Sequence, residues 1–414
     1  MILLELISNK DKFLNILKEE WLKAEDTFPD FLSEINPETK IINELYIKSI
    51  SQNLQKQIGS FRKIPIQRGK WRNKALDMIY DILYREDIIG LHHYMNQNEI
   101  DSFFGELMEF LRHVRKFAPD LLFTDIGQAI RNYIVYAVFK KLNKETSGFN
   151  LAAFGYSMLY PFTDNYLDNK SLSSEDKKEY NQLIRDKIDG KEIHPQKLHH
   201  RKTCDLLQNI EDLYPRNLDQ TIYQLLLMML DAQENSLSQQ NKDLPLSDQE
   251  RLEVSIYKGS ISVLMDRFFV NKDTTEEDLI FYLSFGFFLQ LADDLQDIGE
   301  DSRLGHSSLF TTNLQCRQEE AIVNKLLHYV HHIMTEYRSD NESLKHFLLS
   351  NSYLLIFTSV IRSREFFSQE YIATIEKFLP FNTSILMNLQ NNNVETMDRK
   401  LQNKYIKILD ALIK

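Results

Sequence analysis

Apolar residues recur at intervals of three and four along most of the chain, which is the spacing that one face of an α-helix requires. Phe13, Leu17 and Trp21 show this spacing near the start of the sequence. The pattern predicts a succession of long amphipathic helices. The segments that show it are residues 1–60, 75–83, 100–117, 125–142, 152–169, 218–237, 252–269, 276–299, 319–337 and those beyond 344.

Two polar stretches interrupt the helical pattern. Residues 61–74 are basic and contain both proline and glycine, and residues 238–248 contain proline. Both stretches predict loops or linkers, because proline and glycine end regular elements. No fixed-period repeat, phosphate-binding loop, dinucleotide fingerprint or zinc cysteine cluster is visible in the sequence. We therefore expect a helical region of unassigned function over 1–100, followed by one helical domain over 101–414.

Composition strengthens the helical prediction. The 414 residues include only 12 Gly and 9 Pro, although strands and turns need these residues at their corners. The chain also contains 26 Phe and 19 Tyr. A core so rich in aromatic rings could line a sizeable apolar cavity. The expected fold class is all-α.

Charge and hydropathy limit the classes of function. A net charge of −11 disfavours nonspecific nucleic-acid binding and attachment to acidic membranes through a polybasic patch. The longest apolar runs, residues 222–230 and 281–292, fall short of the ~20 residues that a membrane-spanning helix needs. The first residues lack a signal-peptide pattern, and the two cysteines, Cys204 and Cys316, are typical of a reducing compartment. We expect a cytoplasmic protein with no transmembrane segment and no nucleic-acid partner.

The most informative stretch is FYLSFGFFLQLADDLQDIGED, residues 281–301, in which an apolar helix ends in five acidic residues. Asp293, Asp297 and Asp301 are four residues apart and would lie on one helical face. Like charges at this spacing repel one another, and no Lys or Arg occurs within the stretch to compensate them. Mg²⁺ could compensate them, because it prefers carboxylate oxygens as ligands.

A second acidic pair repeats this arrangement. Asp164 and Asp168 are also four residues apart and also end an aromatic-rich run, YSMLYPFTDNYLDN. Each cluster taken alone is equally compatible with a solvated helix end, where water screens the charges. Two such clusters that both lack nearby cations favour a pair of magnesium-binding walls over that alternative.

Two walls of this kind suit the departure of a diphosphate group, which leaves a carbocation that must be shielded from water. Aromatic rings can stabilise such a cation. Tyr156 and Tyr160 precede Asp164 by two turns and one turn of helix, and Tyr282 and Phe285 precede Asp293. Gly286, on the same face, would leave room for a substrate chain. The alternative for each aromatic residue is ordinary core packing.

The residues around these aspartates resemble the class I isoprenoid (terpene) synthase superfamily. Residues 290–297, QLADDLQD, are similar to the second aspartate-rich motif of prenyl-chain synthases, FQxxDDxxD. Residues 290–309 are also similar to the squalene and phytoene synthase signature, QLxNxxRDxxEDxxxGRxxL. Residues 164–168, DNYLD, resemble the first motif, DDxxD, and the extension YLDN is similar to bacterial large-terpene synthases.

The resemblance covers about residues 125–375 and implies a single large helical bundle around a central apolar cavity. It implies a linear prenyl diphosphate as substrate and several Mg²⁺ ions, held by Asp164, Asp168, Asp293, Asp297 and Asp301, the first four of which would act in catalysis. Lys258 lies in YKGS, which resembles the segment where chain synthases carry a diphosphate-binding lysine. Arg131, a cation in an apolar helix, could reach the same group.

Departures from the family motifs narrow the expected reaction. No arginine pair follows Asp168, which argues against chain elongation, and the Asn-Ser-Glu metal triad of plant and fungal cyclases is absent. The first expectation is ionisation followed by cyclisation. Head-to-head condensation of the squalene type is an alternative, and a non-catalytic helical scaffold is another. The sequence is compatible with a homodimer and does not set the oligomeric state.

Overall fold

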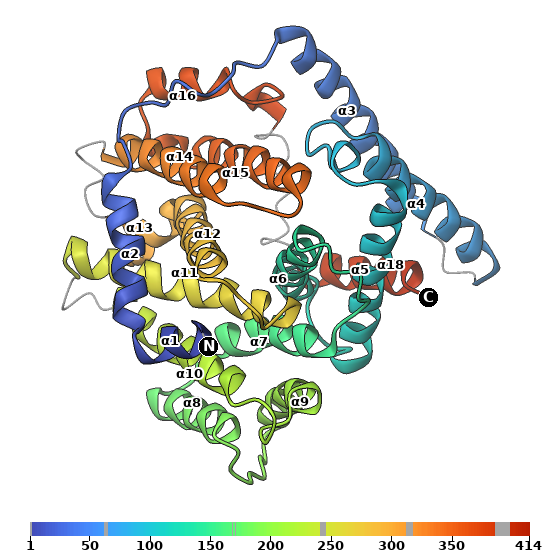
Figure 1. Ribbon diagram of the computed structural model, residues 1–414. Helices are drawn as coiled ribbons and strands as arrows, with labels where there is room; N and C mark the ends of the chain where they lie inside the picture. Colours follow the sequence, from blue (N-terminus) through green and yellow to red (C-terminus); the bar gives the residue numbers. More distant parts are fainter. Residues whose placement is uncertain are drawn as a thin grey trace.

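The computed structural model describes residues 2–61, 65–167, 169, 171–240, 246–311, 318–385 and 398–414 (Figure 1). These residues form helices and turns and include no strand, which confirms the all-α fold class. The α-helices are α1 (Ile2–Ser8), α2 (Lys10–Lys23), α3 (Pro37–Gly59), α4 (Pro65–Arg85), α5 (Gln97–Phe117), α6 (Phe123–Leu142), α7 (Leu151–Leu167), α8 (Ser174–Ile188), α9 (Leu198–Leu213), α10 (Thr221–Ser236), α11 (Asp248–Val270), α12 (Glu276–Gln296), α13 (Ile298–Leu304), α14 (Gln318–Glu336), α15 (Glu342–Arg362), α16 (Gln369–Glu376) and α18 (Arg399–Leu412).

Helices α11 and α12 form the centre of the fold, and the sequence marks where each begins. The Ser247 side chain accepts from the backbone N–H of Glu250, whose carboxylate accepts from the Ser247 N–H. Thr275 and Asp278 make the same reciprocal pair at the start of α12. Each capping box satisfies two N–H groups that would otherwise lack partners, so the start of each helix is fixed locally.

The two central helices cross at a pair of glycines. A Cβ atom added to Gly259 would lie 2.5 Å from the backbone oxygen of Gly286, and one added to Gly286 would meet the backbone oxygen of Gly259. Only hydrogen atoms fit between the two backbones here. The expectation that Gly286 leaves room for a substrate chain is therefore wrong, because the backbone of α11 occupies that space.

We expect Gly286→Ala to destabilise the protein by about 2–3 kcal/mol, because its methyl group would force α11 and α12 apart. Urea unfolding measures the loss. Gly105→Ala on α5 is the matched control, since no atom of the described residues lies within 4 Å of an added Cβ there. That change should be neutral or stabilise the helix by about 0.5–1 kcal/mol. Equal stability of the two variants would contradict the proposed crossing.

The other helices surround this central pair. Helices α14 and α15 pack against α12, α10 packs against α11, and α9 packs against α7. In Figure 1, α14, α15 and α16 lie at one end of the molecule and α8 and α9 at the other, with α11 and α12 between them. Among the described residues, α15 alone is long and apolar enough to cross a membrane by length and composition, and more than half of the relevant segment is buried inside the protein.

The first helices join the same core as the rest of the chain. Phe13 and Leu17 are fully buried, and Trp21 makes edge-to-face contacts with Phe287 and Tyr329, at ring-centroid distances of 5.6 and 5.7 Å. Helices α1 and α2 therefore cover α10, α11, α12 and α14 instead of forming a separate bundle. Helices α3 and α4 run along the outside of the molecule (Figure 1).

The predicted linker at residues 61–74 is wrong for most of its length. Helix α4 begins at Pro65 and continues through Gly69. Proline is accepted at the first position of a helix because its missing N–H would have no partner there.

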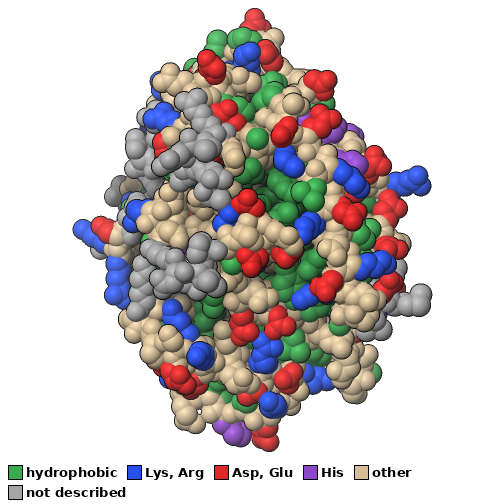
Figure 2. Space-filling model, turned by 90° about the vertical axis from the view of Figure 1, so that its left-hand side faces the viewer, with side chains coloured by type: hydrophobic (Ala, Val, Ile, Leu, Met, Phe, Trp, Pro, Cys, Tyr) green, Lys and Arg blue, Asp and Glu red, His purple; other side chains and the backbone are tan. Residues whose placement is uncertain are grey.

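Charged side chains of both signs are mixed over the face seen in Figure 2, with apolar side chains exposed between them, so no single sign of charge covers that face.

Candidate functional site

The acidic residues at the end of α12 keep the predicted four-residue stacking. Helix α12 ends at Gln296, and Asp297 links it to α13, which carries Asp301. The backbone N–H of Asp297 donates to the backbone oxygen of Asp293 at 3.0 Å. The backbone N–H of Asp301 donates in the same way to the backbone oxygen of Asp297 at 2.8 Å. The helical hydrogen bonds thus continue across the break, so the three aspartates occupy successive turns.

The Asp293 side chain is accessible to solvent, but protein atoms surround most of it. Burial raises the pKa of its carboxyl, while the positive charges of Lys258 and Arg131 lower it. Burial also raises the pKa of Asp301, and a contact of 3.2 Å with the His306 ring lowers it. Asp293 raises the pKa of Asp301 and Lys258 lowers it. Lys258 and Arg131 therefore lie within electrostatic range of Asp293, and Asp301 lies within range of Asp293 and Lys258.

Asp294, the neighbour of Asp293, faces into the protein. Its side chain is buried between α11 and α12, where it accepts hydrogen bonds from Gln290 Nε2 at 2.8 Å and Ser255 Oγ at 3.3 Å. Burial raises its pKa to about 7. Asp294 therefore belongs to the contact between the helices, whereas Asp293 is open to solvent.

The opposite wall is built on α7. The Asp164 carboxylate accepts hydrogen bonds from Gln233 of α10, from Gln128 Nε2 of α6 at 3.4 Å and from the neighbouring Thr163 hydroxyl at 3.4 Å. The predicted second acid of this wall, Asp168, lies outside the described residues. Sequence reasoning missed the two glutamines, because a glutamine in an amphipathic helix carries no sign of its distant partner.

Two helices connect the acidic walls. On α6, Gln128 donates a hydrogen bond to Asp164. Arg131 lies three residues later on the same face, and its charge lowers the pKa of Asp293. On α11, the Ser262 carbonyl accepts a hydrogen bond from the hydroxyl of Tyr156, on α7, at 3.0 Å. Lys258 lies one turn earlier on α11, and its charge lowers the pKa of Asp293. Helices α6 and α11 thus each combine a hydrogen bond to α7 with a cation whose charge lowers the pKa of Asp293.

A small cavity extends from Asp164 along α7. Asp164, Thr163 and Gln233 form its polar part, and Tyr156 and Tyr160 lie among its apolar lining. Its volume is about 50 Å³. Typical ligand pockets hold roughly 300–1,000 Å³, so a prenyl chain would enter only if the surrounding side chains moved apart. The expected large central apolar cavity stays a prediction.

The other two predicted aromatic residues lie elsewhere. Tyr282 is fully buried, and its hydroxyl accepts from Asn143 Nδ2 at 2.7 Å. Phe285 is buried against Phe139, with 5.9 Å between the ring centroids. The structure brings neither residue to Asp164 or to the small cavity, and both make ordinary core contacts.

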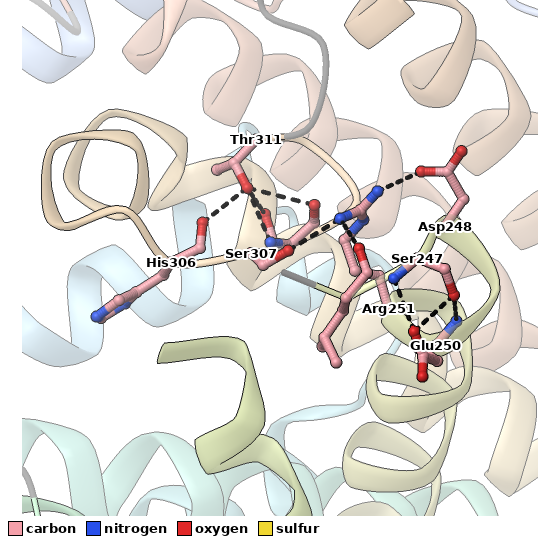
Figure 3. A network of polar contacts seen from close by, with 9 residues as sticks. Ser247, Asp248, Glu250, Arg251, His306, Ser307 and Thr311 are labelled. Carbon is pink, nitrogen blue, oxygen red and sulfur yellow. Dashed lines mark hydrogen bonds and ion pairs between the residues drawn. The ribbon is translucent and has the colours of Figure 1, made fainter. Parts of the chain in front are cut away.

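A polar network secures the segment that follows Asp301 (Figure 3). The guanidinium of Arg251, near the start of α11, donates to Ser307 Oγ at 3.0 Å and also to the Asp248 carboxylate. The Thr311 hydroxyl donates to the backbone oxygen of His306 at 2.8 Å. Because the His306 ring contacts Asp301, the network helps to fix that carboxylate. Arg251 was not predicted as part of the site, since Ser307, its partner there, lies far along the sequence.

Asp266 is the most unusual buried group of α11. Its side chain is 1% exposed, and neither carboxyl oxygen has a hydrogen-bond partner among the described residues. The guanidinium of the adjacent Arg267 donates to the backbone oxygens of Asn271 and Asp273, and burial is the cause of the pKa shift of Asp266. Burial raises the pKa of Asp266 well above its ordinary value of 3.8, so the protonated form is favoured. A single acid within the apolar run SVLMDRFFV was the available sequence signal.

Asp266→Asn should make the stability of the protein less dependent on pH. Because the folded protein keeps this proton to a higher pH than the unfolded chain, the unfolding free energy of the wild type falls as pH rises above 3.8. The variant should match the wild type at acidic pH and exceed it by about 1–3 kcal/mol at mildly alkaline pH. Urea unfolding at both pH values, without Mg²⁺, measures this difference. A constant difference would contradict a buried, protonated carboxyl.

Comparison of the chain with protein-family models, with curated proteins and with solved structures finds no match in any of the three. The resemblance of the two acidic motifs to isoprenoid synthases therefore stays a hypothesis.

Proposed function

We propose that this protein is a cytoplasmic class I terpene synthase, which ionises a linear prenyl diphosphate with the help of Mg²⁺ and then cyclises the resulting carbocation. The observation that carries the proposal is the combination of charges at one site. Asp293 and Asp301 lie two turns apart on one helical face, and the charges of Lys258 and Arg131 lower the pKa of the Asp293 carboxyl. Asp164 is linked to them through α6 and α11.

The donor atoms suit magnesium. Carboxylate oxygens are the ligands that Mg²⁺ prefers. Burial raises the pKa values of Asp293 and Asp301, and the charge of Asp293 raises that of Asp301 further, which favours a bound cation. Asp164 and Asp168 on one wall and Asp293, Asp297 and Asp301 on the other would hold the ions. Bound there, Mg²⁺ would neutralise the charge that develops on the departing diphosphate.

Lys258 and Arg131 would hold the diphosphate itself. In the proposed step, the bond between the allylic carbon and the diphosphate oxygen breaks, and its electron pair stays on that oxygen. An ammonium and a guanidinium beside the leaving group favour this separation of charge, and the planar guanidinium can bind two phosphate oxygens at once. Both cations lie within electrostatic range of Asp293.

The cavity below Asp164 would receive the hydrocarbon chain. Its apolar lining would exclude water, and the ring faces of Tyr156 and Tyr160 would stabilise positive charge in the chain. Leu226, Met229 and Leu230 also line this cavity and would have to move to admit the chain. Cyclisation would then end by proton loss or by capture of water.

Head-to-head condensation of two prenyl diphosphates is the second candidate. The stretch 290–309 favours it, because that stretch is similar to the squalene and phytoene synthase signature beyond the aspartates themselves. The contacts of Asp293, Asp301 and Lys258 would serve this reaction equally well, since it also begins with the loss of diphosphate.

The test is diphosphate release from a panel of prenyl diphosphates of different length, with and without Mg²⁺, followed by mass analysis of the extracted hydrocarbons. Mg²⁺-dependent release with a cyclic product of unchanged carbon number would support the cyclase. A product with twice the carbon number would establish condensation instead. A folded protein that releases no diphosphate from any substrate would overturn both proposals in favour of a helical scaffold.

A further inference from the structure

The turn between α4 and α5 carries three metal-binding side chains that the proposed reaction does not use. Asp87, His92 and His93 lie in this turn, and the two histidines belong to the short 3₁₀ helix η1 (Leu91–His93). One ligand atom from each of the three residues lies within 4.8 Å of the other two. Imidazole nitrogens and carboxylate oxygens are usual ligands of zinc, so the cluster has the composition of a zinc site.

Both imidazole rings direct a nitrogen at the same carboxylate oxygen. Oδ1 of Asp87 lies 3.4 Å from Nε2 of His92 and 2.9 Å from Nε2 of His93. Zinc binds nitrogen and oxygen ligands at about 2.0–2.2 Å, so two corners of a tetrahedral site are about 3.3 Å apart. Both distances are close to that value, and an ion would enter with small side-chain movements. Nδ1 of His92 is shielded from solvent, which leaves Nε2 as the nitrogen that an ion can reach.

The backbone of η1 is attached to the protein core. Leu91 and Met95, on either side of the two histidines, are buried. The ring of Tyr94 contacts Phe347 of α15, with 5.5 Å between the ring centroids. The histidines therefore project from a segment whose position is fixed by burial, and an ion would meet ligands that are already in place.

The segment before η1 brings Asp87 back over the histidines. The carboxylate of Glu86 accepts from the backbone N–H groups of Ile88 and Ile89, which closes the turn directly after α4. Gly90 has a φ of 68°, in the left-handed region that favours glycine. A Cβ atom added to Gly90 would lie 3.0 Å from Cδ2 of His93, so the glycine also leaves room for that ring.

Sequence spacing alone would point to a different histidine pair. His328 and His332 are four residues apart on α14, a spacing that can bind zinc. In the structure, however, Nε2 of His328 contacts the backbone oxygen of Thr27 at 3.0 Å, and Nε2 of His332 contacts the Glu20 carboxylate at 3.1 Å. These two rings have separate partners, whereas His92 and His93 share one.

The ligand set selects zinc over magnesium. Imidazole nitrogens suit zinc and similar transition metals, whereas Mg²⁺ prefers ligands that are all oxygen. The side chains of Asp87 and His93 are 62% and 55% exposed, so water can reach the ion and complete a four-ligand shell. The cluster therefore differs in chemistry from the aspartates proposed to bind Mg²⁺.

We propose that Asp87, His92 and His93 form a zinc site that fastens the end of α4 to η1. Helix α4 ends at Arg85, two residues before Asp87, and it packs against η1 and α18. An ion held by Asp87 and both histidines would join the end of this outer helix to a segment that is buried in the core. The site takes no part in the loss of diphosphate, so the inference does not depend on the proposed function.

The experiment is a Zn²⁺ titration of the whole chain, without an affinity tag and after treatment with a chelator. Excess Mg²⁺ in the buffer occupies sites made of carboxylates alone. Isothermal titration calorimetry should show one Zn²⁺ per chain. Asp87→Asn and His93→Gln should each weaken binding by at least about tenfold, since even the loss of a group that only supports a ligand has an effect of that size.

Zinc should also raise the melting temperature of the wild type. An ion at about 100 times its dissociation constant should raise it by about 3 °C, because the ion binds the folded chain in preference to the unfolded one. Neither Asp87→Asn nor His93→Gln should show this rise. Both side chains are more than half exposed, so both variants should fold, and circular dichroism without zinc checks this.

His332→Gln is the matched control. His332 is 52% exposed and contacts a carboxylate, that of Glu20, much as His93 contacts Asp87. This variant should bind Zn²⁺ as tightly as the wild type. If His332→Gln lost binding while His93→Gln kept it, the ion would lie on α14 and the proposal would be overturned.

Three further results would also overturn the proposal. One is a wild-type protein that binds no Zn²⁺, and another is unchanged affinity in both Asp87→Asn and His93→Gln. The third is binding that depends on these residues but leaves the melting temperature unchanged, which would show that the ion does not fasten α4. Diphosphate release plays no part in these measurements, so their outcome is separate from that of the test of the proposed function.

Discussion

Asp293→Asn is expected to lower Mg²⁺-dependent diphosphate release about 10³-fold, because it removes one negative charge from the proposed metal site. Asp294→Asn, one residue further on, should stay within about tenfold of the wild type. The difference arises from orientation. Asp293 is open to solvent beside Lys258 and Arg131, whereas Asp294 is buried against Gln290 and Ser255.

The pair forms its own control, since both changes remove one carboxylate from adjacent positions of the same helix. An asparagine at position 294 can still accept from Gln290, so the contact between α11 and α12 should survive. Initial rates of diphosphate release, measured over a range of Mg²⁺ concentrations, test the expectation, and circular dichroism confirms that both variants fold. Equal losses in the two variants would mean that Asp293 has no special access to the metal.

The sequence predicted the acidic wall well because its geometry is local. Four-residue spacing places Asp293, Asp297 and Asp301 on successive turns, and the backbone hydrogen bonds maintain this stacking even though α12 ends before Asp297. The direction of Asp294 follows from the same helical period once Asp293 is known to face outward. What periodicity alone does not provide is which face meets α11.

Contacts between distant helices were harder to predict. Gly286 was expected to leave space for substrate, yet that space is filled by Gly259, twenty-seven positions earlier in the sequence. A glycine marks a close approach but does not say what approaches. Tyr282 and Phe285 were expected beside the substrate because they precede Asp293 along the same helix. The same spacing is equally consistent with core packing, and both side chains are buried in the core.

The pairing of Lys140 with Glu106 shows the same limit for charged residues. Lys140 and Lys141 end an amphipathic helix, a place where basic side chains usually face solvent. Lys140 is nevertheless 1% exposed, and its ammonium donates to both Glu106 oxygens, at 2.8 and 3.0 Å. It also donates to the Gly148 carbonyl at 2.8 Å. One buried ion pair thus ties α5, α6 and the turn before α7 together, and α6 and α7 carry Arg131 and Asp164.

Lys140→Met is therefore expected to destabilise the protein by about 3–5 kcal/mol, since it leaves the Glu106 carboxylate buried without its cation. The double variant Lys140→Met/Glu106→Gln should be more stable than the sum of the two single losses predicts, by about 2 kcal/mol, because no uncompensated charge remains. The amide oxygen that replaces the carboxylate could still accept from the Tyr133 hydroxyl, which donates to Glu106 at 2.9 Å in the wild type.

Urea unfolding of the two single variants and the double variant completes the cycle. Lys141→Met provides the matched control, since the neighbouring lysine makes a long contact of 3.4 Å with Ser102 Oγ and its loss should cost no more than about 0.5 kcal/mol. Additive losses in the double variant would show that the two charges do not depend on each other. A cost for Lys140→Met as small as that for Lys141→Met would show that the ammonium is not buried, and the attachment of α6 to α5 would need another explanation.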